Sequence, residues 1–223
     1  MRVMLSVVAF AALICGWSET FAWQQPAASA DVDARVRQFL ENRRRTWYDM
    51  NVPEADAREM YDIIVANNYK KALEIGTSTG HSGIWIAWAL SQTGGKLITI
   101  DIDRGRHEQA MANFKAAGVD AYIDARLGDA HAIVPALNGP FDFVFSDADK
   151  EWYINYARAV LPKLSVGGCF VTHNVSERRW GGNSEYLQYL RSLPYLETTL
   201  FTRGGGMSVS YKKAPGQPSG LRQ

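Results

Sequence analysis

Short apolar runs alternate with longer amphipathic segments over most of the chain after Lys70. Apolar runs of strand length occupy residues 72–75, 97–102, 122–127, 141–146 and 169–173. Each is followed by a segment with helical features, and we expect these helices to begin at His81, Arg104, Ala130, Trp152 and Ser184. Strands that alternate with helices and read as continuous apolar runs are typical of a parallel sheet covered on both faces. The pattern therefore predicts an α/β fold.

Two more strands are expected near the C-terminus, over residues 196–201 and 207–212. Only residues 202–206 separate them, so they should pair as an antiparallel hairpin. Before the sheet, apolar spacing predicts a helix over residues 31–50, and Pro53 begins a second helix that extends to about residue 67. We expect one domain over residues 31–213, with N-terminal helices at 31–68, a core at 70–213 and a loose tail at 214–223.

Composition narrows the class of partner. The chain has 223 residues, of which 47% are hydrophobic, and its 24 Lys and Arg nearly balance its 23 Asp and Glu. No global field would recruit nucleic acid or an anionic membrane surface. We therefore expect a small-molecule partner, or a second copy of the chain, and no nucleic acid.

A glycine-containing turn joins the first strand of the core to its helix. The strand carries Glu74, and Gly76 and Gly80 follow it, four residues apart. Glycines let the backbone approach a ligand closely, and the N–H groups that open the helix present a partly positive end. A dinucleotide site requires glycine where Ser78 stands, and Glu74 would repel a phosphate. The turn thus favours a cationic ligand with a carboxylate and disfavours an NAD-dependent oxidoreductase.

This turn resembles motif I of class I S-adenosylmethionine-dependent O-methyltransferases, in particular those similar to catechol and caffeoyl-coenzyme A O-methyltransferases. The resemblance continues in order through residues 96–103, 127–130, 141–153 and 167–174, and it covers most of the chain from residue 51 to 212. It implies a Rossmann-like fold with a seven-stranded, mostly parallel sheet, a C-terminal antiparallel hairpin and helices on both faces. It also implies S-adenosylmethionine as the cofactor, and a homodimer.

The residues expected to hold the cofactor lie mainly at the ends of the first four strands. Asp101 ends the second strand, where a carboxylate can accept hydrogen bonds from a ribose diol. Asp103 is equally well explained as a helix cap, and Asp129 could both border the adenine and cap a helix. Ser82 would bind the methionine carboxylate or serve as a helix cap. The expected set is Glu74, Gly76, Thr77, Ser78, Gly80, Ser82, Asp101, Asp129, Ala130 and Asp147.

The expected chemical groups follow the fourth and fifth strands. In the resembling family, the first carboxylate of Asp-Ala-Asp-Lys binds a divalent metal ion, and the lysine is the candidate general base; these positions are Asp147 and Lys150 here. Metal-dependent members carry Asp-Asn after the fifth strand, where this chain has His173 and Asn174. The histidine removes one negative charge and a hard oxygen donor, which shifts metal preference away from Mg²⁺.

Two interpretations of this departure remain open. In the first, which we favour slightly, Asp147, His173 and Asn174 still bind a divalent ion such as Mg²⁺, Mn²⁺ or Zn²⁺. In the second, the metal is lost and His173 acts directly in acid–base catalysis beside Lys150. We also expect Trp152, Tyr153 and Trp180 as candidate walls for a flat acceptor, although each is more often a packing residue.

The function best supported by these residues is O-methylation of a small hydroxylated, catechol-like acceptor with S-adenosylmethionine as the methyl donor. A non-catalytic S-adenosylmethionine-binding protein on the same fold is the main alternative, since a fold alone does not establish an activity.

The N-terminal 30 residues have the features of a secretory signal peptide. Arg2 precedes a nearly uncharged run over residues 3–17, and small-residue sites follow. The run is shorter than the roughly 20 residues that a membrane-spanning helix needs. A start codon placed too early is the alternative. Export would conflict with a cofactor made in the cytosol, so localisation stays open. Cleavage would leave Cys169 as the only cysteine and exclude an intramolecular disulfide.

Overall fold

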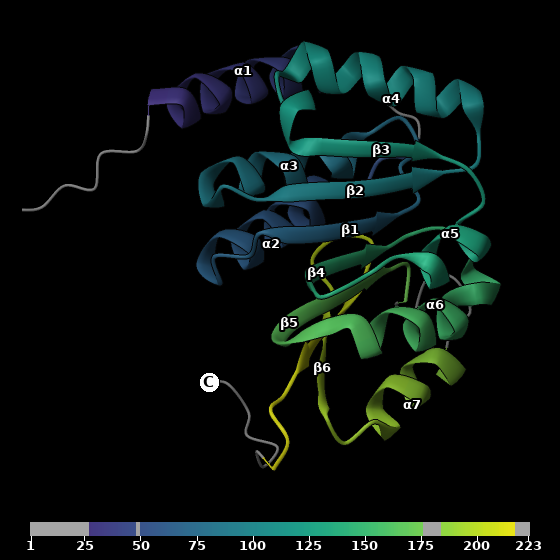
Figure 1. Ribbon diagram of the computed structural model, residues 1–223. Helices are drawn as coiled ribbons and strands as arrows, with labels where there is room; N and C mark the ends of the chain where they lie inside the picture. Colours follow the sequence, from purple (N-terminus) through teal and green to yellow (C-terminus); the bar gives the residue numbers. More distant parts are fainter. Residues whose placement is uncertain (1–26, 48–49, 176–183, 217–223) are drawn as a thin grey trace, which may run out of the picture.

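A single twisted sheet organises the molecule. The computed structural model describes residues 27–47, 50–175 and 184–216 of the chain. The sheet has seven strands within these ranges, in the spatial order β3-β2-β1-β4-β5-β7-β6 (Figure 1). Strands β1 to β5 pair in parallel, and β7 is antiparallel to both β5 and β6. The bounds are β1 Lys71–Ile75, β2 Lys96–Asp101, β3 Ile123–Leu127, β4 Phe141–Ser146, β5 Leu164–His173, β6 Leu196–Phe201 and β7 Met207–Lys212.

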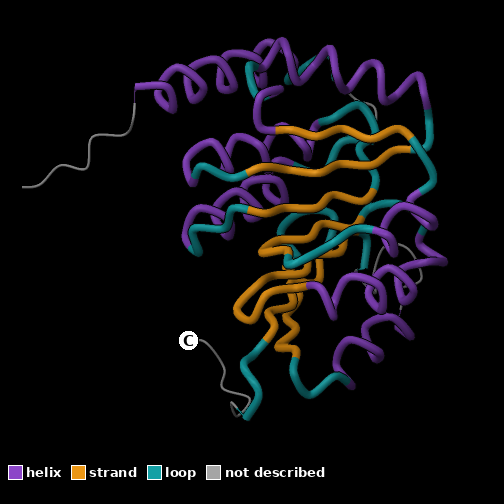
Figure 2. Tube along the Cα trace, viewed as in Figure 1, coloured by secondary structure: helices purple, strands orange, loops and turns teal. Residues whose placement is uncertain are grey.

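Helices cover both faces of the sheet, as the apolar strands require (Figure 2). One apolar cluster packs α1 to α4 against side chains such as Ala72 and Phe145, and a second packs α5 to α7 against the opposite face through Leu73 and Val144. The helices are α1 Ala27–Arg43, α2 Glu54–Ala66, α3 His81–Thr93, α4 Arg104–Ala117, α5 Ala130–Ala136, α6 Tyr153–Val160 and α7 Ser184–Ser192, with 3-10 turns at Asp120–Tyr122, Lys150–Trp152 and Leu161–Lys163. The predicted fold class is confirmed.

Two element boundaries differ from the prediction by five residues or more. The first helix ends at Arg43 rather than near residue 50, and the indole Nε1 of Trp47 donates at 2.8 Å to Thr79 Oγ1 in the turn between β1 and α3. Strand β5 begins at Leu164, five residues before the predicted start, because it continues through a bulge at Gly167 and Gly168 opposite β4. The paired glycines interrupt the apolar run in the sequence but not the strand.

The strand order indicates where a ligand would bind. From β1, the sheet extends through β2 and β3 on one side and through β4 and β5 on the other. In open parallel sheets, ligands bind beyond the carboxyl ends of the strands where the order reverses in this way. The ends of β1, β2, β4 and β5 therefore define the place to look for a site.

Some predictions fall on residues that the structure does not describe. They are most of the expected signal peptide, over residues 1–26, the Trp180 wall and the end of the tail, over residues 217–223. Among residues 27–47, 50–175 and 184–216, no helix combines the length and the apolar character that crossing a bilayer would need. Trp85, Trp88 and Cys169 are buried in the core.

Candidate functional site

A cavity of about 640 Å³ lies at the carboxyl ends of the parallel strands. Its wall is formed by the β1–α3 turn, the ends of β2, β4 and β5, and the start of α5. The expected site residues that line it are Gly76, Thr77, Ser78, Ser82, Asp101, Asp129, Ala130, Asp147, Lys150, His173 and Asn174. Residues far apart in the sequence are thus brought to one cavity, as the parallel topology predicts.

Two glycines allow the backbone of the β1–α3 turn to adopt left-handed conformations and to pack closely against its neighbours. Gly76 adopts φ +99°, and a Cβ there would lie 2.8 Å from the backbone oxygen of Asp147. Gly80 adopts φ +94° and immediately precedes α3, where a Cβ would lie 2.7 Å from the Phe114 ring. Both positions combine a left-handed conformation with a close approach, so a larger residue would have to displace β4 or α4. Gly80 therefore shapes the turn from outside the cavity wall.

Asp101 fixes this turn to the end of β2. Its Oδ2 accepts a hydrogen bond of 2.7 Å from the Ser78 amide, and its Oδ1 accepts one of 2.8 Å from the Asp103 amide. Each oxygen keeps a further lone pair, so the oriented carboxylate can still accept bonds from a diol. Asp103 itself caps α4 by accepting from the Arg106 amide at 2.9 Å, which supports the capping role proposed for it.

Glu74 is fully buried below the turn and does not line the cavity. Its Oε2 accepts a 2.6 Å hydrogen bond from Thr99 Oγ1, and the Ser82 hydroxyl also bonds to the carboxylate. Its Oε1 has no hydrogen-bond partner among the described residues. Burial raises the pKa of Glu74 to about 7 against the opposing hydrogen bonds, and the charges of Asp147 and Asp101 add to the rise. Glu74 can thus influence a ligand through Ser82 and through its charge.

The opposite flank contains the predicted Asp129 and three residues that sequence reasoning missed, His131, Met50 and Ile102. Asp129 caps α5 by accepting from the His131 amide at 2.9 Å, and the His131 ring stacks on Trp152 with centroids 3.7 Å apart. Met50 and Ile102 line the cavity although they are 68% and 70% exposed. Exposed apolar side chains at the edge of a cavity are suited to the faces of a planar ring. The exposed Ile102, directly after a buried strand, was the available signal.

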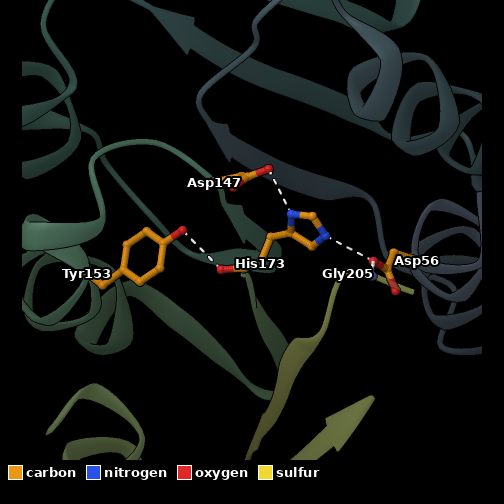
Figure 3. A network of polar contacts seen from close by, with 5 residues as sticks. All are labelled: Asp56, Asp147, Tyr153, His173 and Gly205. Carbon is orange, nitrogen blue, oxygen red and sulfur yellow. Dashed lines mark hydrogen bonds and ion pairs between the residues drawn. The ribbon is translucent and has the colours of Figure 1, made fainter. Parts of the chain in front are cut away.

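His173 lies between two carboxylates at the floor of the cavity (Figure 3). Its Nδ1 is 3.1 Å from Asp147 Oδ2, its Nε2 is 2.9 Å from Asp56 Oδ2, and both contacts have hydrogen-bond geometry. Ionised carboxylates only accept, so the ring satisfies both contacts as an imidazolium, in which both nitrogens donate. Burial alone would lower the pKa of His173, but the bonds to Asp147 and Asp56 outweigh it and raise the pKa to about 9.

Asp56 is the residue of this site that the sequence analysis did not identify. It lies in the first turn of α2, it is fully buried, and its Oδ2 also accepts a 2.6 Å bond from the Gly205 amide. Asp56 shares the inward face of α2 with Met60, Ile63 and Ile64, at helical spacings of four, seven and eight residues. A carboxylate on an apolar helix face was the signal that could have revealed it.

The expected metal ligands do not fit a metal ion in this arrangement. A histidine ligand must offer a lone pair from a ring nitrogen, and each nitrogen of His173 already lies within hydrogen-bond distance of a carboxylate oxygen. Within the part of the chain that the structure describes, no group of three or more His, Cys, Asp or Glu side chains could hold a metal. The geometry thus does not support the ion expected on Asp147, His173 and Asn174, and it equally leaves His173 no nitrogen for direct acid–base catalysis.

The remaining chemical residues differ in their access to the cavity. Lys150 is exposed and lines it. Tyr153, a candidate wall, is instead buried, and its hydroxyl donates to the backbone oxygen of His173 at 3.0 Å. Tyr153 therefore supports His173 from behind and is not a wall for an acceptor.

Comparisons with known proteins agree with this geometry. An O-methyltransferase family model matches residues 27–185. The caffeoyl-CoA O-methyltransferase 1 of Eucalyptus globulus is 32% identical over 191 residues, which cover 74% of this chain and 76% of the relative. The flavonoid 3',5'-methyltransferase of Vitis vinifera is 32% identical over 145 residues, covering 62% and 61%. Among solved structures, the O-methyltransferase TomG of Streptomyces achromogenes in complex with SAM aligns with a TM-score of 0.68 at 24% identity, covering 86% of this chain and 92% of that one.

The close approach of Gly205 to His173 can be tested by adding one methyl group. A Cβ at Gly205 would lie 2.6 Å from His173 Nε2, so Gly205→Ala should lower the free energy of unfolding by about 2 kcal/mol or more. Gly105→Ala, in the first turn of α4, is the matched control, because its nearest contact is 3.4 Å and alanine favours the helix. Urea denaturation measures both; equal stability of the two variants would contradict the predicted contact.

The charge on His173 should make stability depend on pH in one direction. Its pKa is raised above the ordinary 6.5, so the stabilisation is complete below pH 6.5 and is lost as the pH rises through about 9. The charges facing the ring are those of Asp56 from α2 and Asp147 from the end of β4. The difference in unfolding free energy between wild type and His173→Gln should shrink by on the order of 3 kcal/mol over this window. A difference that does not change with pH would show that the ring is neutral.

Proposed function

Because the chain belongs to the O-methyltransferase family, we propose that it transfers the methyl group of S-adenosylmethionine to a hydroxyl of a small aromatic, catechol-like acceptor. The observation that carries the proposal is the position of the β1–α3 turn. Asp101 fixes this turn at the edge of a 640 Å³ cavity, which is lined by most of the expected site residues. The names of the relatives, which act on caffeoyl-CoA and on flavonoids, support a phenolic acceptor.

The described residues match the parts of the methyl donor. Asp101 suits the ribose diol, because its two oxygens are oriented by backbone amides and keep lone pairs for further bonds. The N-terminal amides of α3, including that of Ser82, suit the carboxylate. Met50 and Ile102 offer apolar contact to the adenine faces, with Asp129 at its edge. When bound, S-adenosylmethionine supplies an activated methyl group on a positively charged sulfur.

The chain's part in the transfer is alignment and proton removal. An in-line displacement needs the acceptor oxygen held opposite the leaving sulfur. The O–H bond of the acceptor breaks, an O–CH₃ bond forms, and the electron pair of the S–CH₃ bond stays on sulfur. Lys150 lines the cavity together with Asp147 and, as the neutral amine, can take the hydroxyl proton, since a phenol with a pKa of about 10 is mostly protonated at neutral pH.

Binding and turnover together test this proposal. S-adenosylmethionine should bind the purified protein in calorimetry, and caffeate, catechol or a flavonoid with vicinal hydroxyls should gain one methyl group by mass spectrometry. Lys150→Met should lower kcat by roughly 10²–10⁴-fold because it removes the proton acceptor, while the affinity for S-adenosylmethionine stays within about twofold. Donor binding without turnover of any phenol would favour the non-catalytic alternative, and no donor binding would refute both functions.

Glu74 should couple donor binding to proton release. Its pKa is raised to about 7, and a cation bound nearby would favour the charged form, so binding near pH 7 should release protons and tighten as the pH rises through 7. Calorimetry in buffers of different ionisation enthalpy measures the released fraction. Glu74→Gln should abolish the release in this pH window, whereas release that persists in the variant would assign the proton to another group.

A further inference from the structure

We infer that His173, as an imidazolium held by Asp56, takes the place of a divalent metal ion in this site and fixes the Asp147 carboxylate for methyl transfer. The inference rests on the proposed function and adds to it a metal-free mechanism and a positioning residue, Asp56, from outside the cavity.

The two carboxylates around His173 each need a hydrogen-bond donor from the ring. Asp56 and Asp147 each place an oxygen within 3.1 Å of a different nitrogen of the same ring. Only the doubly protonated ring can donate to both carboxylates, and in that form neither nitrogen keeps a lone pair for a metal. A cation is therefore already built into the chain between the two carboxylates.

Asp56 is buried beside His173. The carboxylate is fully buried, and among the described residues His173 Nε2 and the Gly205 amide donate to it. A buried carboxylate without an opposite charge is strongly destabilising. There is no space for a side chain at Gly204 beside this carboxylate, because a Cβ there would lie 2.1 Å from Asp56 Oδ1. The local structure is thus shaped around a charged pair of Asp56 and His173.

Asp147 links the pair of Asp56 and His173 to the cavity. Its side chain is 19% exposed, it lines the cavity, and its Oδ2 is bonded to His173 Nδ1. This bond holds the Asp147 carboxylate in one orientation. The other oxygen, Oδ1, makes no contact with His173. Asp56, His173 and Asp147 together carry a net charge of −1, which favours a positively charged methyl donor. His173 and Asp56 act through Asp147 and are positioning residues.

A competing arrangement is chemically reasonable and must be separated by experiment. A metal ion could lie between His173 Nδ1 and Asp147 while Nε2–H still donates to Asp56, as in carboxylate–histidine–metal sites. The two arrangements differ in the proton on Nδ1: the imidazolium has it and the metal ligand has lost it. Direct observation of that proton and of ion binding therefore decides between them.

The experiment uses the full chain purified without chelator. Metal content is measured by mass spectrometry, Mn²⁺ binding by electron paramagnetic resonance, and the two ring nitrogens of His173 by ¹⁵N NMR at pH 7.5. We expect no stoichiometric divalent ion, no saturable Mn²⁺ binding and two protonated nitrogens. Methyl transfer should stay within about twofold when EDTA replaces Mg²⁺. A stoichiometric ion together with an unprotonated Nδ1 would overturn the inference.

The variant Asp56→Asn, with Asp62→Asn as its control, tests the positioning role of Asp56. Asp56→Asn keeps an oxygen for the Gly205 amide but removes the charge, so His173 should become neutral by NMR and kcat should fall about tenfold or more, with KM for the methyl donor changed less than threefold. Asp62→Asn, an exposed carboxylate on the same helix, is the matched control and should change neither. An unchanged kcat and an unchanged ring in Asp56→Asn would overturn the positioning role.

The double variant Asp56→Asn with His173→Asp is the positive control for ion binding. It restores an oxygen ligand beside Asp147 and Asn174 without placing a second carboxylate against Asp56, and it should bind Mn²⁺ at least tenfold more tightly than wild type. Equal binding by wild type would overturn the inference. Mn²⁺ binding and NMR need no methyl donor, so a chain that transfers no methyl group would contradict the proposed function while the ion question is still decided.

Discussion

The contact of His173 with two carboxylates is the interaction on which the site depends. It joins three parts of the chain that are far apart in sequence: α2 through Asp56, the end of β4 through Asp147, and the β6–β7 loop through the Gly205 amide. Buried charges are stable only when each meets an opposite charge or enough hydrogen bonds. The N-terminal helices are therefore docked on the sheet by a specific polar contact as well as by apolar packing.

The rest of the cavity follows from the topology of the sheet. Five parallel strands end at one edge, and the reversal of strand order beside β1 leaves room there for a ligand. Asp101 holds the β1–α3 turn in place, and Glu74 supports it from below through Ser82. Backbone amides and carboxylates thus surround the space for a cationic donor, whereas apolar side chains such as Ile102 remain at the mouth.

The sequence predicted the fold and the residues around the cofactor turn because both depend on local patterns. Apolar runs identify strands, and Gly76, Ser78 and Asp101 lie at strand ends that any parallel sheet brings together. The role of His173 could not be predicted in the same way, because its partner Asp56 is 117 residues away and nothing local links the two. The resemblance to metal-dependent relatives suggested ligands at that position, and only the geometry showed that both ring nitrogens were already engaged.

The glycine-rich loop between the last two strands has a consequence for the order of assembly. Asp56 belongs to the second helix of the chain, yet its amide donor at Gly205 lies 149 residues later. A nascent chain whose final hairpin has not emerged from the ribosome lacks that donor and the strand, β7, that pairs with His173. Closing so long a loop is entropically costly until the contacts form. The helix α2 therefore reaches its native position only once the β6–β7 hairpin has been synthesised.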